Sequence, residues 1–358
     1  MNQPLTVTLA RKAGGRVTAI ALGAAFATLL AMPLLHLLPA DSALHLSAYS
    51  LTLTGKILCY AIVALALDLV WGYAGLLSLG HGLFFALGGY AMGMYLMRQA
   101  SGDSLPAFMT FLSWNELPWY WVGTQHFLWA LCLVVLVPGA LAFAFGYFAF
   151  RSRIRGVYFS IMTQALTFAG MLLFFRNETG FGGNNGFTDF RSILGFPITA
   201  PGTAPPPVPR HRRAARGQPA ARLAPGAEQV RPGPHRAARR REPPDVLRLR
   251  PARYKLFVWT LSACSAASPA RCSCRRWGSS TPARSPTNSI EAAVWVALGG
   301  RGTLLGPLLG AGVVNGAKSW FTVAFPEYWL FFLGALFIVV TLYLPRGLLG
   351  LLRKEKEQ

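Results

Sequence analysis

Charge is scarce in this sequence of 358 residues, of which only 13% are Asp, Glu, Lys or Arg. Hydrophobic residues make up 53% of the chain, and the mean hydropathy is +0.40. A chain of this composition is too apolar for an ordinary soluble domain. The sequence therefore predicts a membrane protein.

Motifs for hydrolytic chemistry are missing. The sequence has no G-x-x-x-x-G-K-[ST] phosphate loop, so the chain cannot by itself hydrolyse ATP through a P-loop mechanism. It has neither a G-x-S-x-G nucleophile elbow nor an H-E-x-x-H pair, which argues against an intramembrane hydrolase. The five cysteines lack the paired spacing of a zinc site. We expect a protein that is not an enzyme and that needs no metal or other cofactor.

Acidic residues number only 13 against 34 Lys and Arg, and most of the resulting net charge of +21 lies in one segment. Residues 201–284 hold 17 Arg and one Lys but three acidic residues, which contributes +15. From Pro201 to Arg250 there are 12 Arg, 11 Pro and 9 Ala, with no Lys, Ile, Phe, Tyr, Trp, Met or Asn. Such a composition cannot bury a core. We expect an aberrant segment over 201–285, disordered or frame-shifted, that interrupts the protein.

Two explanations of this segment differ in class. Arg, Pro, Ala and Gly are encoded by GC-only codons, so a GC-rich gene read out of frame gives this composition. A second patch of the same kind runs from Cys264 to Ser285, after the apolar island "RPARYKLFVWTLSA" at Arg250 to Ala263. The alternative is a basic tether for RNA or anionic lipid.

Long uncharged runs predict an all-α, polytopic transmembrane bundle, because a helix needs about 20 apolar residues to cross a bilayer. We expect five spans within residues 1–200, and further spans with a cytoplasmic tail within 286–358. This makes about eight recognisable spans, where an intact version would have ten. The strong runs are Val17 to Leu38, Ala74 to Met97, Phe127 to Phe150 and Val157 to Phe175, and the weaker ones are Ile57 to Leu67, Ile290 to Gly299, Thr303 to Ala317 and Tyr328 to Leu344.

Basic clusters predict the orientation. With residues 11–16 in the cytoplasm, four crossings bring "RSRIRG" at residues 151–156 back to the same side, as the positive-inside rule requires. The loops at 98–125 and after the fifth span are then external. The C-terminal "RKEKEQ" is cytoplasmic, so the number of crossings is even.

The stretch "GLLSLGHGLFFALGGY", residues 75–90, has five glycines among sixteen residues. Close helix packing through small residues is one interpretation. The other is a broken or re-entrant helix, which lipid tolerates only where protein or a water-filled path encloses it. Ser78 and His81 favour the second, although a structural hydrogen bond competes with substrate contact for His81. The glycines concerned are Gly80, Gly82, Gly88 and Gly89.

Several ordered motifs carry a resemblance. "GYAGLLSLGHGLFFALGGYA", "TGFGGNNG", "SIEAAVWVALGGRGTLLGPLLGA" and "LPRGLLGLL" resemble the permease subunits of branched-chain amino-acid ABC importers. More narrowly, "SWNELPWYW" with "FFRNETGFGGNNGFTDF" resembles the second permease subunit of urea importers in that family.

The resemblance implies a bacterial inner-membrane protein in the lipid bilayer. Its implied partners are a second homologous permease subunit, two cytoplasmic ABC ATPase subunits and a periplasmic substrate-binding protein, with no nucleic acid. The middle of such a permease holds two spans and the segment that docks on the ATPases. Coupling is therefore in question for a chain with this middle region, and an inactive product of a damaged gene stays an alternative.

Urea is small, neutral and rich in hydrogen-bonding groups, so its path needs polar side chains without a charge clamp. The candidates are Ser78, His81, Thr163, Gln164, Asn184 and Asn185. For Thr163 and Gln164, hydrogen bonding between helices is the competing role. Asp68 and Glu291 lie near span ends, where we expect solvated or capping roles. A branched-chain amino acid or a short amide remains an alternative substrate.

Overall fold

A computed structural model describes residues 47–343 with gaps at 103, 155, 189, 191, 194–195, 198–250, 271–278, 281–283, 304 and 326, together with residues 35 and 347–348. The expected first span, the basic cluster at 11–16, the arginine-rich stretch 201–250 and the tail at 353–358 lie outside the described residues, apart from residue 35.

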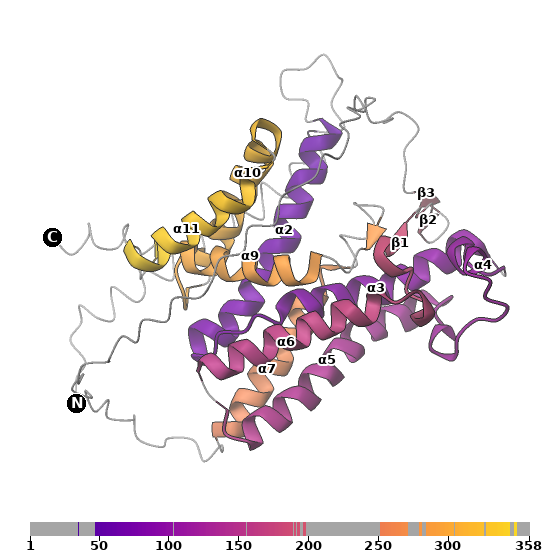
Figure 1. Ribbon diagram of the computed structural model, residues 1–358, viewed down its shortest axis with the longest axis horizontal. Helices are drawn as coiled ribbons and strands as arrows, with labels where there is room; N and C mark the ends of the chain where they lie inside the picture. The colour runs from indigo at the N-terminus through magenta and orange to yellow at the C-terminus, as the bar shows by residue number, and fades with distance from the viewer. Residues whose placement is uncertain are drawn as a thin grey trace, which may run out of the picture.

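The described chain is built of helices, and its strands have two residues each (Figure 1). β1 pairs with β4, and β2 pairs with β3, both antiparallel. The elements are α2 (Ala48–Asp68), the π-helical turn η1 (Leu69–Tyr73), α3 (His81–Ser101), α4 (Ala107–Phe111), the 3-10 turn η2 (Trp119–Trp121), α5 (Phe127–Arg151), α6 (Val157–Phe175), the 3-10 turns η3 (Asn177–Thr179) and η4 (Gly183–Asn185), β1 (Phe187–Thr188), β2 (Ser192–Ile193), β3 (Phe196–Pro197), α7 (Pro251–Ala267), β4 (Ser279–Ser280), α9 (Arg284–Gly299), α10 (Leu305–Ala324) and α11 (Trp329–Tyr343).

Three described segments are long and apolar enough to cross a membrane: Tyr49–Tyr73, Phe127–Arg151 and Val157–Phe175. Large apolar side chains such as Leu128, Phe148 and Tyr158 are exposed along the last two. A helix surface of this kind needs lipid around it. The fold confirms the prediction of an all-α helical membrane bundle.

Helix α2 begins earlier than the run Ile57 to Leu67 predicted. Ser47 caps it, since its side chain accepts the N–H of Ser50 at 3.2 Å. The helix then carries the half-buried Lys56 within its span. An uncharged run is therefore too strict a criterion here, because one long lysine side chain can reach a polar site beside an apolar helix.

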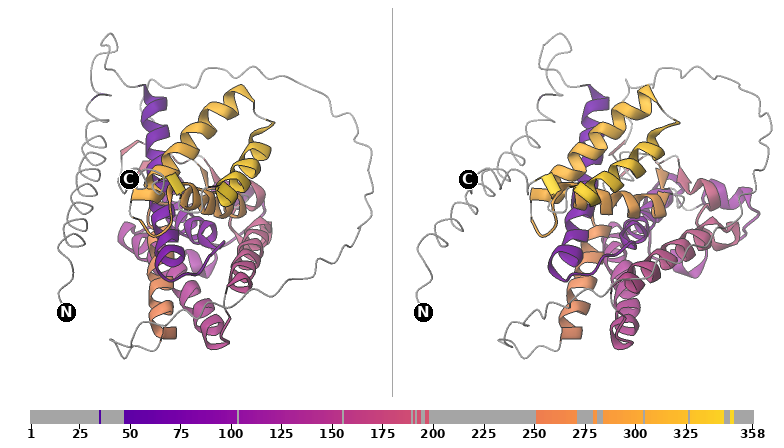
Figure 2. Two further views of the ribbon diagram at one scale, coloured as in Figure 1. Left: turned by 90° about the vertical axis from the view of Figure 1, so that its left-hand side faces the viewer. Right: turned by 60° about the vertical axis from the view of Figure 1, so that its left-hand side comes forward.

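Helix α9 forms the centre of the bundle and contacts α2, α3, α6, α10 and α11. Val294, Trp295 and Val296 are fully buried in succession, so this helix is enclosed on all sides. Figure 2 shows α10 and α11 beside α2 in the upper part of the molecule and α7 in its lower part.

Helix α7 lies within the segment 201–285 and packs against α5 (Figure 1). Trp259 is fully buried and donates its indole N–H to the carbonyl of Ala142 at 2.8 Å. Gly146 of α5 permits this approach, because a Cβ there would lie 2.6 Å from the ring of Trp259. The helix continues past the island, to Ala267, so residues 251–267 belong to the packed bundle.

Candidate substrate path at a helix break

The expected helix from Ala74 to Met97 begins later than predicted. The π-helical turn η1 ends at Tyr73, residues 74–80 are not helical, and α3 begins at His81. Gly75 has a φ of 69°, which favours glycine. Turns of the π type are frequent at functional sites. Residues 74–80 are therefore a non-helical connection between η1 and α3, which we call the break.

Three hydroxyl groups on α6 form hydrogen bonds with backbone groups of the break. Ser160 donates to the carbonyl of Leu77 at 2.8 Å, Thr167 donates to the carbonyl of Leu79 at 3.1 Å, and Thr163 accepts the N–H of Leu79 at 3.0 Å. The three hydroxyls lie on one face of α6, since they are three and four residues apart. Without them, these part-buried backbone groups would be unpaired, which costs on the order of 2–7 kcal/mol each in an apolar environment.

His81 lies in a fully buried chain of hydrogen bonds. The ring nitrogen Nδ1 is 3.1 Å from Ser78 Oγ, and Nε2 is 2.7 Å from Ser262 Oγ on α7. Ser262 donates its proton to the carbonyl of Ala66, so it must accept from Nε2–H. Nδ1 then accepts from Ser78, which accepts the N–H of Gly80. A neutral histidine satisfies every bond in this chain.

The hydrogen-bond chain gives His81 a structural position in this conformation. Its ring also meets Phe84 and Trp259 edge-on, at centroid distances of 6.0 and 5.8 Å. Both ring nitrogens are engaged, and no part of the side chain reaches solvent. Any substrate that touches His81 would first have to displace Ser78 or Ser262.

The predicted glycines act in two ways. Gly88 permits close packing, because a Cβ there would lie 2.5 Å from the carbonyl oxygen of Ala267 on α7. Gly80 faces Thr163, with 3.3 Å between its added Cβ and that side chain. The N–H of Gly82 donates to Ser289 of α9 at 2.9 Å. Gly89 is buried within α3. Gly88 therefore has the close-packing role, and Gly80 lies in the non-helical connection before α3.

The predicted path residues separate into two places. Ser78, His81 and Thr163 meet at the break, and the half-buried Gln164 follows on α6, where its Oε1 has no hydrogen-bond partner within the described residues. Asn184 and Asn185 are exposed in η4, beyond the far end of α6. Thr163 is 12 residues from that end, about 18 Å of helix.

Four hydroxyls at the break were not among the predicted residues: Ser160, Thr167, Ser262 and Ser289. The first two have a sequence signal, because they flank Thr163 at helical spacing in an apolar run. Ser262 and Ser289 have none, since they lie about 180 and 210 residues from the break and only folding brings them there.

Asp68 and Glu291 are both buried, and of the two expected roles Asp68 has the capping one. Asp68 is 2% exposed and accepts the N–H of Gly302 at 2.8 Å, so it caps the turn between α9 and α10. Glu291 is fully buried and pairs with Lys318 of α10 at 2.5 Å. Both carboxylates join segments more than twenty residues apart, because a buried charge needs a partner.

The two motifs that carry the urea resemblance pack together. Tyr120 donates to the carbonyl of Thr179 at 2.6 Å, and its ring stacks on Phe181 at 5.3 Å. Trp121 is 1% exposed and meets Phe187 edge-on at 5.4 Å. They form one structural unit beside the ends of α3 and α6. Among the described residues, no group of three His, Cys, Asp or Glu side chains is placed to hold a metal ion.

Three apolar helices long enough to span a bilayer define a helical membrane protein. The chain belongs to the family described as branched-chain amino acid transport system / permease component, whose model matches residues 49–205 and 245–341. The match includes α7 and omits residues 206–244, inside the arginine-rich stretch. A search of curated proteins and a search of solved structures each returned no match.

Proposed function

We propose that the chain is the permease subunit of an ABC importer and forms the translocation path for urea. The observation that carries this proposal is the break at residues 74–80, enclosed by α6, α7 and α9. Interrupted helices at membrane depth supply backbone groups for substrate recognition in transporters. Permease components of this family move substrate without an enzymatic step of their own.

The substrate proposal rests on the chemistry around the break. The side chains that bond the break directly are hydroxyls and one neutral histidine. This set suits a small neutral molecule with several donors and acceptors, as urea is. The packed unit that contains Tyr120 and Phe181 carries the motifs that resemble urea permeases. A branched-chain amino acid or a short amide is the alternative within the same family.

The hydroxyls at the break are paired with protein groups in this conformation. Passage of urea therefore requires α6 or α7 to move, which would release Thr163 or Ser262 toward the substrate. The energy for this movement comes from partner ATPases, since the chain has no phosphate loop. We propose two ATPases, a second homologous permease and a periplasmic binding protein, with both termini of this multi-pass chain in the cytoplasm of a bacterial inner membrane.

We also propose that residues 201–250 and the patch from Cys264 to Ser285 result from a frame error. The family match omits residues 206–244, which supports the proposal for the first stretch, whereas it continues through the second. The test is translation of the other two DNA frames over residues 201–285. We expect two apolar spans separated by a short charged helix. Stop codons or polar sequence in both frames would favour the basic tether instead.

Uptake of labelled urea tests the function, in cells that carry the partner subunits and a frame-repaired chain. Replacement of Gly80 and Gly82 by Leu is expected to abolish uptake with the protein still in the membrane, because an added Cβ at residue 80 already lies 3.3 Å from Thr163 and residue 82 is buried within α3. The control is Gly312→Ala, where an added Cβ meets no atom within 4 Å. Uptake of leucine in place of urea would assign the amino-acid substrate, and unchanged uptake in the double variant would refute the path.

A further inference from the structure

The turn between α9 and α10 holds the chain just before the break. Asp68, the last residue of α2, accepts the N–H of Gly302 at 2.8 Å. Gly72 of η1 lies against the same turn, since a Cβ there would lie 2.5 Å from the nitrogen of Gly302. The guanidinium of Arg301 lies 5.1 Å from the ring centre of Trp71, which is also in η1. The backbone that enters the break is therefore fixed to this turn.

Helix α9 also holds the chain just after the break. The N–H of Gly82 belongs to the first turn of α3, whose N–H groups have no acceptor within their own helix. Ser289 of α9 is 1% exposed and accepts this N–H at 2.9 Å. Ser289 lies ten residues before the end of α9 at Gly299, about 15 Å along the helix axis. The α9–α10 hairpin, residues 284–324, thus contacts the chain on both sides of the break.

The hairpin is joined internally at its turn and at its open end. Near the turn the two helices touch closely, because a Cβ on Gly310 would collide with the carbonyl oxygen of Trp295. At the open end the buried Glu291 of α9 pairs with Lys318 of α10, two residues from the contact with α3. Closely packed interiors transmit a displacement more than they absorb it. The two contacts with the break therefore belong to one rigid body.

We propose that the α9–α10 hairpin is a clamp that fixes the separation of the two ends of the break and so sets the backbone conformation of residues 74–80. Asp68 and Ser289 are its positioning residues. The hydroxyls of α6 bond Leu77 and Leu79 between these ends, so they can release the middle of the break while the ends stay in place. The use of the clamp in transport rests on the proposed function, whereas the clamp itself can be tested without transport.

The test is hydrogen–deuterium exchange of the purified full-length chain in lipid nanodiscs, read by mass spectrometry. Three N–H groups report on the break: those of Leu76, Leu79 and Gly80, each of which donates a hydrogen bond in this conformation. Their exchange is slow as long as the break keeps these bonds. A loosened clamp should appear as faster exchange of residues 74–80.

Asp68→Ala and Ser289→Ala should each speed the exchange of residues 74–80 by at least about fivefold. Because the hairpin is one body, each change should also reach the opposite end. Asp68→Ala should speed exchange of the Gly82 N–H, and Ser289→Ala should speed that of the Gly302 N–H. Independent contacts would give factors that multiply, whereas the double variant should exchange at most about twofold faster than the faster single variant.

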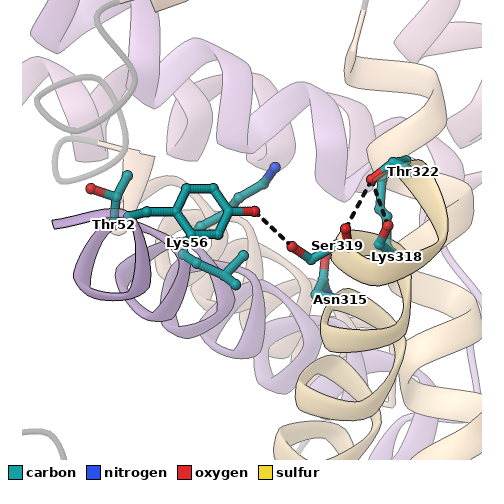
Figure 3. A pocket seen from close by; sticks show the side chains of 8 residues that line it. Thr52, Lys56, Asn315, Lys318, Ser319 and Thr322 are labelled. Carbon is teal, nitrogen blue, oxygen red and sulfur yellow. Dashed lines mark hydrogen bonds between the residues drawn. The ribbon is translucent and has the colours of Figure 1, made fainter. Parts of the chain in front are cut away.

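Thr322→Ala is the matched control on α10, because its hydroxyl bonds to the carbonyl of Lys318 at 2.7 Å, within its own helix (Figure 3). Exchange across α5, together with gel filtration, shows whether each variant is folded. Asp68→Asn and Ser289→Cys weaken the two bonds without removing the acceptor, so they should give smaller increases at both ends. These two variants decide the test if an Ala variant does not fold.

Unchanged exchange of residues 74–80 in the variants would overturn the clamp, as would faster exchange confined to the substituted end. The proposed function fails separately, because an assembled importer that takes up neither urea nor leucine refutes it even if exchange supports the clamp. In an active importer, Ser289→Ala should raise KM for uptake at least threefold, whereas a merely structural role would lower only the amount of protein in the membrane. An unchanged KM would overturn the role of the clamp in transport.

Discussion

Replacement of Ser262 by Ala tests the hydrogen-bond chain that joins α7 to the helix break. The substitution removes the acceptor of His81 Nε2–H and the donor to Ala66, and it leaves the small side-chain volume almost unchanged. A buried donor without a partner costs about 1–3 kcal/mol, whereas hydrogen bonds between membrane helices average about 0.6 kcal/mol, with a maximum of about 1.7. Because His81 is fully buried, we expect the upper part of the membrane range, about 1–1.7 kcal/mol.

Ser265 supplies the matched control on the same helix. Its hydroxyl bonds to the carbonyl of Leu261, within its own helix, so Ser265→Ala should change stability by less than about 0.5 kcal/mol. The measurement is the free energy of unfolding of the purified chain in mixed micelles, titrated with a denaturing detergent. A double-mutant cycle with His81→Ala should give a coupling energy of about 0.5–2 kcal/mol, since each single variant breaks the same bond.

Equal destabilisation by Ser262→Ala and Ser265→Ala would refute the reasoning. A coupling energy near zero would have the same meaning, because it would place His81 and Ser262 in separate environments. In either case α7 would not be tied to the break, and the proposed release of Ser262 during transport would have to be abandoned.

Three further predictions follow from the packing and from the basic clusters. Gly88→Ala should destabilise the protein by about 1–3 kcal/mol in the same unfolding assay, because its Cβ would lie 2.5 Å from an α7 carbonyl oxygen. The control is Gly312→Ala, where an added Cβ meets no atom within 4 Å. Equal effects of the two substitutions would refute the close contact. Asp68→Ala should lower the free energy of unfolding by about 1–3 kcal/mol, because it leaves the N–H of Gly302 unpaired. Asp68→Asn keeps an acceptor and should lower it less. The reverse order of the two variants would exclude this bond. Cysteine labelling at Arg153 and near both termini should report the cytoplasm at all three places, and a periplasmic result at Arg153 would overturn the span assignment.

Composition and periodicity were sufficient for the class of fold. The spans Phe127–Arg151 and Val157–Phe175 agree with the predicted runs because lipid requires about 20 apolar residues whatever the neighbours are. The glycines and polar side chains near Ser78 marked the stretch as unusual for a spanning helix, and residues 74–80 are indeed not helical. The prediction for helix α2 was too short because it stopped at the charged residue Lys56. In the folded protein this side chain lies beside α10, where polar groups surround it.

The partners of these residues depend on tertiary structure. The sequence placed His81 and Ser78 in one turn, but only the fold brings Ser262 and Ser289 to the same break from α7 and α9. The pairing of Glu291 on α9 with Lys318 on α10 likewise arises from helices that meet in space. A single sequence determines which segments must avoid water, because hydrophobicity belongs to each residue; which polar groups satisfy one another depends on distances that only the packed helices set.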